Sequence, residues 1–421
     1  METPCGSYYL YFGEIYTAKL YFTLQRDYDI MFKTFSEVIY VNKLNKELLK
    51  ANIEKIAEYD LKNHKLFGSA YFVMQDNEVI YNNCFGATSK SGTNPVTEKT
   101  IFRLASMTKP VTAIATLILV ERGLLSLSDK VADYLPEFKN VHVSEVNDLG
   151  EVIDLGKPKK DITILNLLNH TAGIGCSVPK LQKMTAEDDK TLENSVKFFA
   201  KSGLDFEPES KQQYSGTGAF DLLAKIIEKV TDTDYQEFLK KEIFAKCDMP
   251  DTTFVPTDEQ WSRVIAMHNR IDGENCEVKM RENCVFFNTP CTHYLGGAGL
   301  VSTIADYSNF AKMLLNNGET PNGKILTEET FKLLHTPTVP KEIMPNNERW
   351  GLAVRIVVND AYKVLPVGAY GWSGAYGAHF WIDPENKIAA VFMKNSRVDG
   401  GSGNESARNF EKAVNDSFNL D

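Results

Sequence analysis

The sequence predicts an α/β (α+β) fold in which one lobe combines a sheet with helices and a second lobe is helical. Apolar residues at helical spacing over residues 48–57 indicate a helix near the start of the first lobe. Residues 69–85 have the composition of a β-hairpin that turns at Asp76-Asn77. Alternating apolar segments recur near the C-terminus, at residues 376–382 and 388–393. We expect these strands, from the two ends of the chain, to share one sheet.

The two lobes are expected to interleave along the chain. The sheet lobe would comprise about residues 44–124 and 291–421 and would be closed by a helix at residues 407–418. Residues 125–290, between these parts, read as helices and long loops. The clearest of these helices are expected at residues 220–230 and 235–244. The sequence contains no internal repeat and no low-complexity tract.

Three short motifs occur in the order that a serine-acylating hydrolase would need. They are Ser106-Met107-Thr108-Lys109, Tyr214-Ser215-Gly216 and Trp372-Ser373-Gly374. A serine hydroxyl is a poor nucleophile near neutral pH, so it requires a neighbouring group that takes its proton. Ser106 and Lys109 would meet across one helical turn, because positions i and i+3 lie on one face of a helix. The spacing therefore predicts Ser106 as a nucleophile and Lys109 as its proton acceptor.

The residues around this pair predict a helix that begins at Ser106. Residues 108–120 are apolar almost all round, which is typical of a helix buried on every side, and Gly123 would end it. Pro110 is tolerated only in the first turn of a helix, so Ser106 should lie at or near the N-terminus. Free backbone N–H groups and the positive end of the helix dipole would favour a negative charge forming beside Ser106.

A second Ser-x-x-Lys pattern, Ser177 and Lys180, is expected to have no catalytic role. The pair flanks Pro179 in a loop-like run after Gly173 and Gly175. Nothing in such a run would hold the two side chains together.

The three motifs and several further stretches resemble the serine β-lactamase and penicillin-recognising superfamily, and most closely its class C-type and esterase branches. The likeness extends from about residue 44 to the end of the chain. It implies a β-lactamase/transpeptidase-like fold, with an antiparallel sheet flanked by helices, an all-helical lobe and a site between the two. The further stretches are residues 101–105, 123–129, 134–138, 167–173 and 296–300.

The resemblance implies a role for each motif residue. Ser106 corresponds to the nucleophile, Lys109 to its proton-accepting partner and Tyr214 to the tyrosine that shares or relays the proton. Trp372-Ser373-Gly374 stands where many members have a substrate-binding Lys-Thr-Gly on the strand that edges the site. The oxyanion hole would consist of the backbone N–H groups of Ser106 and Ala375.

Two departures from the family pattern favour ester or small amide substrates over β-lactams. Gly216 stands where the tyrosine motif often ends in asparagine, so a side-chain amide that could hold an amide substrate is missing. Trp372 replaces the strand lysine and provides an apolar wall instead of a cation that would attract a carboxylate. Similar tryptophan-containing variants occur among the esterases of this superfamily.

Three other residues with reactive or charged side chains are interpreted as structural or surface residues. His170 invites a Ser-His-Asp hypothesis, but His-Thr-Ala-Gly resembles a structural turn of the family. His379 alternates with aromatic residues on an expected strand and is interpreted as a structural histidine. Arg397 could bind a substrate carboxylate, but a solvated surface arginine is the preferred interpretation.

No metal or cofactor is expected. Cys276, Cys284, Cys291 and His293 cluster loosely, without the paired spacing of structural zinc sites. The glycine run at residues 296–299 matches neither phosphate-loop template and is interpreted as a tight turn beside the site.

Composition agrees with a compact soluble enzyme that acts on a small molecule. The chain has 421 residues, of which 43% are hydrophobic and 24% charged, enough for a large core. Its formal net charge of -10 argues against a nucleic-acid partner. No apolar stretch is long enough for a membrane helix. Seven scattered cysteines are typical of reduced thiols, and we expect a cytoplasmic protein.

Residues 1–43 lie before the region that resembles the superfamily. Residues 8–12 are aromatic, but Glu2 and Glu14 lie where a secretory signal would carry positive charge and an unbroken apolar run. The segment is either an extra helix on the body or the product of an upstream start codon, with translation beginning at Met31.

Together these features predict a serine hydrolase that acts through an acyl-enzyme on ester or small amide substrates. The alternative with the same chemistry is a class C-type β-lactamase or a D-peptidase such as a D-aminopeptidase. An alternative of another class is a non-catalytic ligand-binding module of the same fold. Intact Ser106, Lys109 and Tyr214 argue against this module, because a retired site need not retain all three groups.

Overall fold

The structure is a computed structural model that describes residues 42–278, 292–362 and 364–419. Lys43–Asp421 form one compact unit. The extension expected over residues 1–43 lies outside the described residues except for its last two positions.

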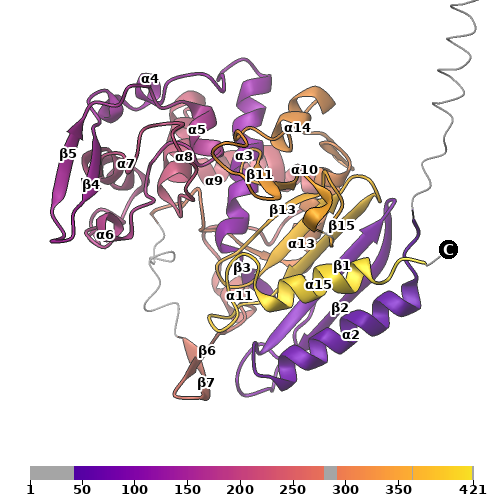
Figure 1. Cartoon of the computed structure of the whole chain (residues 1–421). Helices are drawn as coiled ribbons and strands as arrows, with labels where there is room; N and C mark the ends of the chain where they lie inside the picture. Colours follow the sequence, from indigo (N-terminus) through magenta and orange to yellow (C-terminus); the bar gives the residue numbers. More distant parts are fainter. Residues whose placement is uncertain (1–41, 279–291, 363, 420–421) are drawn as a thin grey trace, which may run out of the picture. The chain divides into compact units, whose positions relative to one another are not determined.

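A seven-stranded antiparallel sheet forms the centre of this unit (Figure 1). The strand order is β11-β12-β13-β14-β15-β1-β2, so strands from the two ends of the chain pair in the middle, as the sequence predicts. Asp76 and Asn77 turn the β1–β2 hairpin with positive φ angles. The strands are β1 (Gly68–Gln75), β2 (Glu78–Gly86), β11 (Glu348–Trp350), β12 (Arg355–Val357), β13 (Tyr370–Ser373), β14 (His379–Asp383) and β15 (Ile388–Met393).

Helices cover both faces of the sheet. Along β1, Ala70 and Phe72 face the core shared with the helical lobe, whereas Tyr71 and Val73 face a second core under the terminal helices. Every residue of β1 is therefore buried, which explains its continuous apolar run. The terminal helices α2 (Lys46–Lys62) and α15 (Glu405–Asn415) pack together on this outer face, while α13 (Ile304–Leu315) packs on the inner face (Figure 1).

The inner face carries α3 (Thr108–Glu121), which is buried from Thr108 to Leu119. Its even burial explains why the sequence shows little amphipathic pattern in this helix. α3 packs against α8 (Gly218–Thr231) of the helical lobe and against α14 (Glu328–Leu334). α3 thus lies between α8, in the segment of residues 125–290, and α14.

The stretch expected to be helical contains helices and two additional hairpins. The helical spacing predicts α8 and α9 to within a few residues. The hairpins were not predicted, because their short strands do not alternate between apolar and polar residues. The helices of this stretch are α4 (Val131–Tyr134), a 3₁₀ turn (Pro136–Phe138), α5 (Ile164–Leu168), α6 (Val178–Leu181), α7 (Leu192–Ser202), α8, α9 (Tyr235–Leu239), a π-helical turn (Lys240–Phe244), α10 (Ala245–Cys247) and α11 (Asp258–Ser262). The hairpins are β4–β5 (Val143–Val146, Val152–Gly156) and β6–β7 (Met267–Ile271, Glu274–Val278).

The remaining elements are short. They are β3 (Ile101–Arg103) paired with β8 (Val301–Thr303), β9 (Glu319–Thr320) paired with β10 (Gly323–Lys324), and 3₁₀ turns at Ala105–Met107 and Asp360–Tyr362. In the described part of the chain, no helix combines the length and apolarity needed to cross a membrane.

Candidate active site

Ser106 lies in the 3₁₀ turn between β3 and α3. The turn Ala105–Met107 runs directly into α3, so Ser106 lies close to the N-terminus of the helix, as predicted. The preceding residue, Ala105, has a φ of 46°, in the left-handed region that a residue with a Cβ adopts only at an energetic cost. This strained residue turns the chain from strand to helix and presents the Ser106 side chain at the junction.

Lys109 is buried in the first turn of α3 and makes three polar contacts. Its Nζ lies 3.3 Å from Ser106 Oγ, 2.5 Å from the Gly216 carbonyl oxygen and 2.8 Å from the Gly297 carbonyl oxygen. The two carbonyls come from distant segments, so the folded chain holds the amine on three sides. Glycine at position 297 leaves room for this contact, because a Cβ there would lie tightly, 3.1 Å from Lys109 Nζ and 3.0 Å from the Gly216 oxygen.

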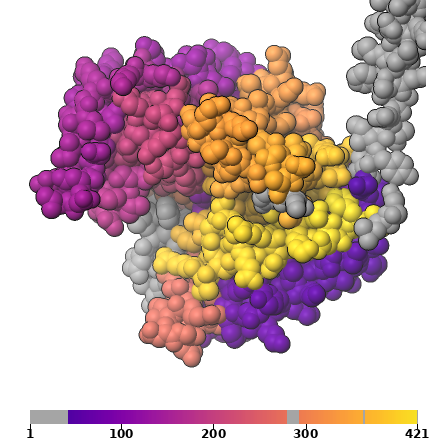
Figure 2. Space-filling model, in the orientation of Figure 1, coloured from indigo at the N-terminus to yellow at the C-terminus, as the bar shows by residue number. Residues whose placement is uncertain are grey.

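Tyr214 lies beside this amine within a group of aromatic rings. Its ring centroid is 4.9 Å from Lys109 Nζ. The rings of His170, Trp350 and Trp372 lie 4.6, 6.0 and 5.3 Å from the Tyr214 ring. Trp372 Nε1 donates a hydrogen bond of 3.3 Å to the Tyr214 hydroxyl, so the indole supplies a hydrogen-bond donor to the tyrosine. Figure 2 shows the pink part of the chain, near residue 200, beside an orange part beyond residue 300.

The strand motif sends its side chains to opposite faces of the sheet. Trp372 faces Tyr214, and a Cβ on Gly374 would lie 2.4 Å from the Leu104 oxygen, so the end of β13 runs beside the Ser106 turn. Ser373, between them, points to the outer face, where its Oγ lies 2.8 Å from His379 Nδ1. Only the backbone of Ser373 is thus left to serve the inner site. Ala375, the expected oxyanion donor, follows in an exposed turn.

His170 is a buried, neutral support for the tyrosine segment. Burial lowers the pKa of His170 well below its ordinary value, and the charges of Lys109 and Arg355 act in the same direction. The neutral ring accepts a hydrogen bond of 3.2 Å at Nδ1 from the backbone N–H of Ser215. His170 has a φ of 63°, in keeping with the structural turn interpreted from the sequence.

A buried ion cluster that the sequence did not reveal supports the loop behind Lys109. Asp221, in α8, accepts hydrogen bonds from the Gly296 N–H at 3.1 Å, from Ser195 Oγ at 2.8 Å and from His293 Nε2 at 3.2 Å. His293 Nδ1 also lies 3.3 Å from a carboxylate oxygen of Asp189. Gly296 adjoins Gly297, so the cluster anchors the loop whose carbonyl holds Lys109. The available signal was Asp221 itself, a carboxylate within an apolar helical run.

The charge of His293 is expected to make the free energy of unfolding fall at alkaline pH. Burial alone would lower the pKa of His293, but Asp221 and Asp189 outweigh it and raise the pKa to about 10. Because this exceeds the value of about 6.5 in an unfolded chain, the stabilisation is complete below pH 6.5 and is lost as pH rises through 10. We expect the denaturant midpoint to fall between pH 7 and 10, and less steeply in His293→Gln. Equal slopes in both proteins would contradict the assignment.

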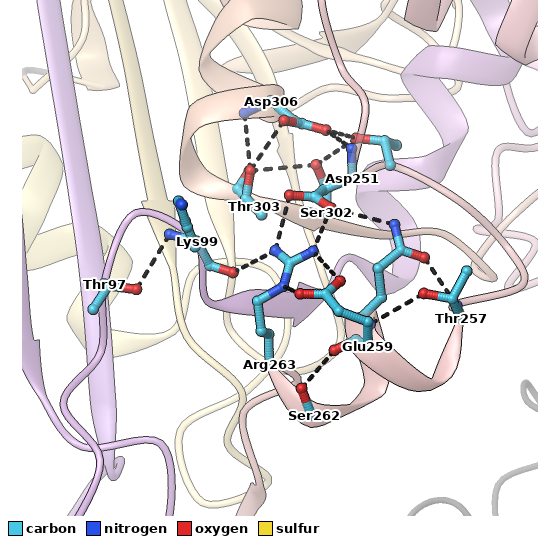
Figure 3. Close-up of polar contacts among 12 residues, drawn as sticks. Thr97, Lys99, Asp251, Thr257, Glu259, Ser262, Arg263, Ser302, Thr303 and Asp306 are labelled. Atoms are coloured by element: carbon cyan, nitrogen blue, oxygen red, sulfur yellow. Dashed lines mark hydrogen bonds and ion pairs between the residues drawn. The ribbon is translucent and has the colours of Figure 1, made fainter.

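A second polar network anchors the strand that leads to Ser106 (Figure 3). Arg263 donates to Asp251 at 2.5 and 2.8 Å and to the Lys99 carbonyl at 2.9 Å, two residues before β3 begins. Asp306, at the start of α13, accepts from the Asp251 N–H at 2.8 Å. Burial raises the pKa of Asp306 to about 6. The network joins the segment 251–263 to the β3–β8 pair, and so holds the strand that leads to Ser106.

The other candidate residues from the sequence lie away from Ser106. Lys180 belongs to the short helix α6 rather than to a loop, and its Nζ forms a buried ion pair of 2.7 Å with Asp205. It bonds to Ser144 and not to Ser177. Arg397 is exposed. Cys284 and Cys291 of the loose cysteine cluster lie outside the described residues.

Comparisons with known proteins agree with this architecture. The solved structure of EstCE1, a hydrolase with promiscuous acyltransferase activity, superimposes with a TM-score of 0.75 at 22% identity, covering 88% of this chain and 99% of that one. The fold is therefore of the β-lactamase/transpeptidase type. A model of the β-lactamase family matches residues 49–414, and the chain belongs to this family of serine hydrolases.

Two curated relatives align with this chain over most of their own length. Esterase EstB of Burkholderia gladioli is 25% identical over 383 residues, which cover 84% of this chain and 92% of the relative. Protein Rv1367c of Mycobacterium tuberculosis is 27% identical over 369 residues, covering 82% and 88%.

Proposed function

We propose that this protein hydrolyses short esters and small amides through an acyl-enzyme formed on Ser106. The observation that carries the proposal is the position of Lys109 Nζ, 3.3 Å from Ser106 Oγ and held by two backbone carbonyls. The Gly216 and Gly297 carbonyls hold the amine beside the Ser106 hydroxyl, where Lys109 would act as the proton acceptor. The similarity to an esterase supports the same chemistry.

The reaction would proceed in two steps. Ser106 Oγ attacks the substrate carbonyl while its proton passes to Lys109, and Tyr214 helps to return that proton to the leaving alcohol or amine. The backbone N–H groups of Ser106 and Ala375 stabilise the tetrahedral oxyanion, and such donors contribute about 2.7–4 kcal/mol each to the transition state. Water then attacks the acyl-enzyme by the same route in reverse.

The substrate preference would follow from Trp372 and Gly216. Trp372 places an apolar indole ring beside Tyr214 and is 6% exposed, and it carries no ammonium group to pair with a substrate carboxylate. Gly216 supplies only a carbonyl, which Lys109 already occupies. Both features favour uncharged acyl groups over the carboxylate-bearing β-lactams.

The test compares a short-chain nitrophenyl ester with a chromogenic cephalosporin. We expect the kcat/KM for the ester to exceed that for the cephalosporin by roughly 10²-fold or more, which corresponds to the loss of one charge-assisted contact with the carboxylate and one amide contact. A cephalosporin turned over as fast as the ester would instead assign the protein as a β-lactamase. Turnover of neither, without acylation, would favour a binding module.

Gly216→Asn is a matched variant for this test. A Cβ at position 216 would have no heavy atom within 4 Å, so a side chain can begin there without a clash. The added amide is expected to raise the ratio of cephalosporin to ester turnover severalfold. An unchanged ratio would show that this position does not determine the preference.

A further inference from the structure

The outer face of β13 carries a second group of reactive side chains, on the opposite side of the sheet from Ser106. Trp372 and Gly374 point to the inner face, so Ser373 points outward, toward α15. Ser373 pairs across the ladder with His379 of β14, and Glu411 of α15 lies above them. None of these three side chains contributes to the mechanism on Ser106.

The three side chains form a continuous hydrogen-bonded relay. Ser373 Oγ lies 2.8 Å from His379 Nδ1, and His379 Nε2 lies 2.9 Å from Glu411 Oε1. A carboxylate accepts hydrogen bonds and does not donate them, so the proton of the neutral ring belongs on Nε2. Nδ1 is then the acceptor of the Ser373 hydroxyl proton. A nucleophile within hydrogen-bond reach of a base, with the base oriented by a third group, is the arrangement that activates serine.

The relay opens into a cavity of about 440 Å³ on the outer face. Ser373, His379 and Glu411 all line it, together with the aromatic side chain of Trp381 and the guanidinium groups of Arg355 and Arg408. The volume lies within the range of small-molecule pockets. The relay residues are 4–8% exposed, which is sufficient for contact with a small molecule in the cavity and insufficient for free hydration.

We propose that Ser373, His379 and Glu411 form a second nucleophilic centre that is acylated by small, activated esters. Ser373 Oγ would form a bond to the ester carbonyl carbon as its proton passes to His379 Nδ1. The ester C–O bond then breaks, and the proton leaves with the alcohol. Glu411 would stabilise the imidazolium that forms between these events, and the cavity is also lined by two cations, Arg408 and the Arg355 that pairs with Glu348 at 2.6 Å.

This centre is independent of the proposed reaction on Ser106. The two hydroxyls lie on opposite faces of the sheet, and no residue of the relay contacts Lys109. The Ser106→Ala variant of the full chain therefore isolates the second centre.

The experiment exposes Ser106→Ala to a fluorophosphonate and, separately, to p-nitrophenyl acetate, and then measures intact mass and maps the modified peptide. We expect one adduct per chain, on Ser373. Ser106→Ala/Ser373→Ala should lose the adduct, and Ser106→Ala/His379→Gln should form it roughly 10²-fold more slowly. Ser402, which lines the same cavity outside the relay, provides the control, since Ser106→Ala/Ser402→Ala should react as fast as Ser106→Ala.

Two results would overturn the proposal. If Ser106→Ala forms no adduct while wild type is labelled at Ser106, the relay is only structural and the proposed function stands. An adduct that persists in Ser106→Ala/Ser373→Ala lies on another residue. Circular dichroism of each variant confirms that a missing adduct does not reflect unfolding. Failure of the proposed function itself would appear separately, as wild type without an adduct on Ser106.

Discussion

Replacing Ser106 with alanine is expected to lower kcat/KM for a nitrophenyl ester by on the order of 10⁴–10⁶-fold, as the loss of a catalytic serine does in other hydrolases. The hydroxyl is the group that would form the acyl bond, and it lies 3.3 Å from Lys109 Nζ. The fold should persist, because the side chain is only partly buried and its removal leaves the Gly216 and Gly297 contacts of Lys109 intact. Steady-state kinetics and thermal unfolding measure the two effects.

The chain provides its own control in Ser177, the serine of the second Ser-x-x-Lys pattern. Ser177 and Lys180 have the same spacing in sequence, but Lys180 bonds to Ser144 and Asp205. Ser177→Ala should therefore retain the wild-type rate. A Ser106→Ala enzyme with unchanged turnover would remove Ser106 from the mechanism, whatever the control shows.

Replacing Asp221 with asparagine is expected to produce the largest loss of stability, about 3–5 kcal/mol, because it leaves the buried charge of His293 without its main partner. Asp221 also holds the Gly296 N–H and Ser195, so its loss loosens the loop that positions Lys109. We expect a lower denaturant midpoint and, in the folded fraction, slower acylation of Ser106.

Asp205→Asn is the matched comparison. It removes the acid of another buried ion pair, 2.7 Å from Lys180, without touching the loop at Gly296. It should cost stability while the acylation rate of the folded protein changes little. Equal loss of acylation in both variants would show that the effect reflects general destabilisation and not the support of Lys109.

Local features of the fold were predictable from sequence because neighbours along the chain determine them. The hairpin turn at Asp76-Asn77 follows from residues that tolerate positive φ. The helix after Ser106 follows from an apolar run that has proline only in its first turn. The β4–β5 hairpin was missed because its second strand is exposed and carries no alternating apolar pattern.

The sequence by itself determined the meeting of Ser106 and Lys109, since one helical turn places them together wherever the helix lies. The tertiary structure alone decided what surrounds them. Gly216 and Gly297 are 107 and 188 residues from Lys109, yet both bond to its amine. Likewise, the alternation of side chains along a strand places Ser373 and Trp372 on opposite faces of the sheet. Only the packing of α15 against the sheet brings Glu411 to His379. Contacts within one turn depend on backbone geometry, whereas contacts between distant segments depend on how whole elements pack.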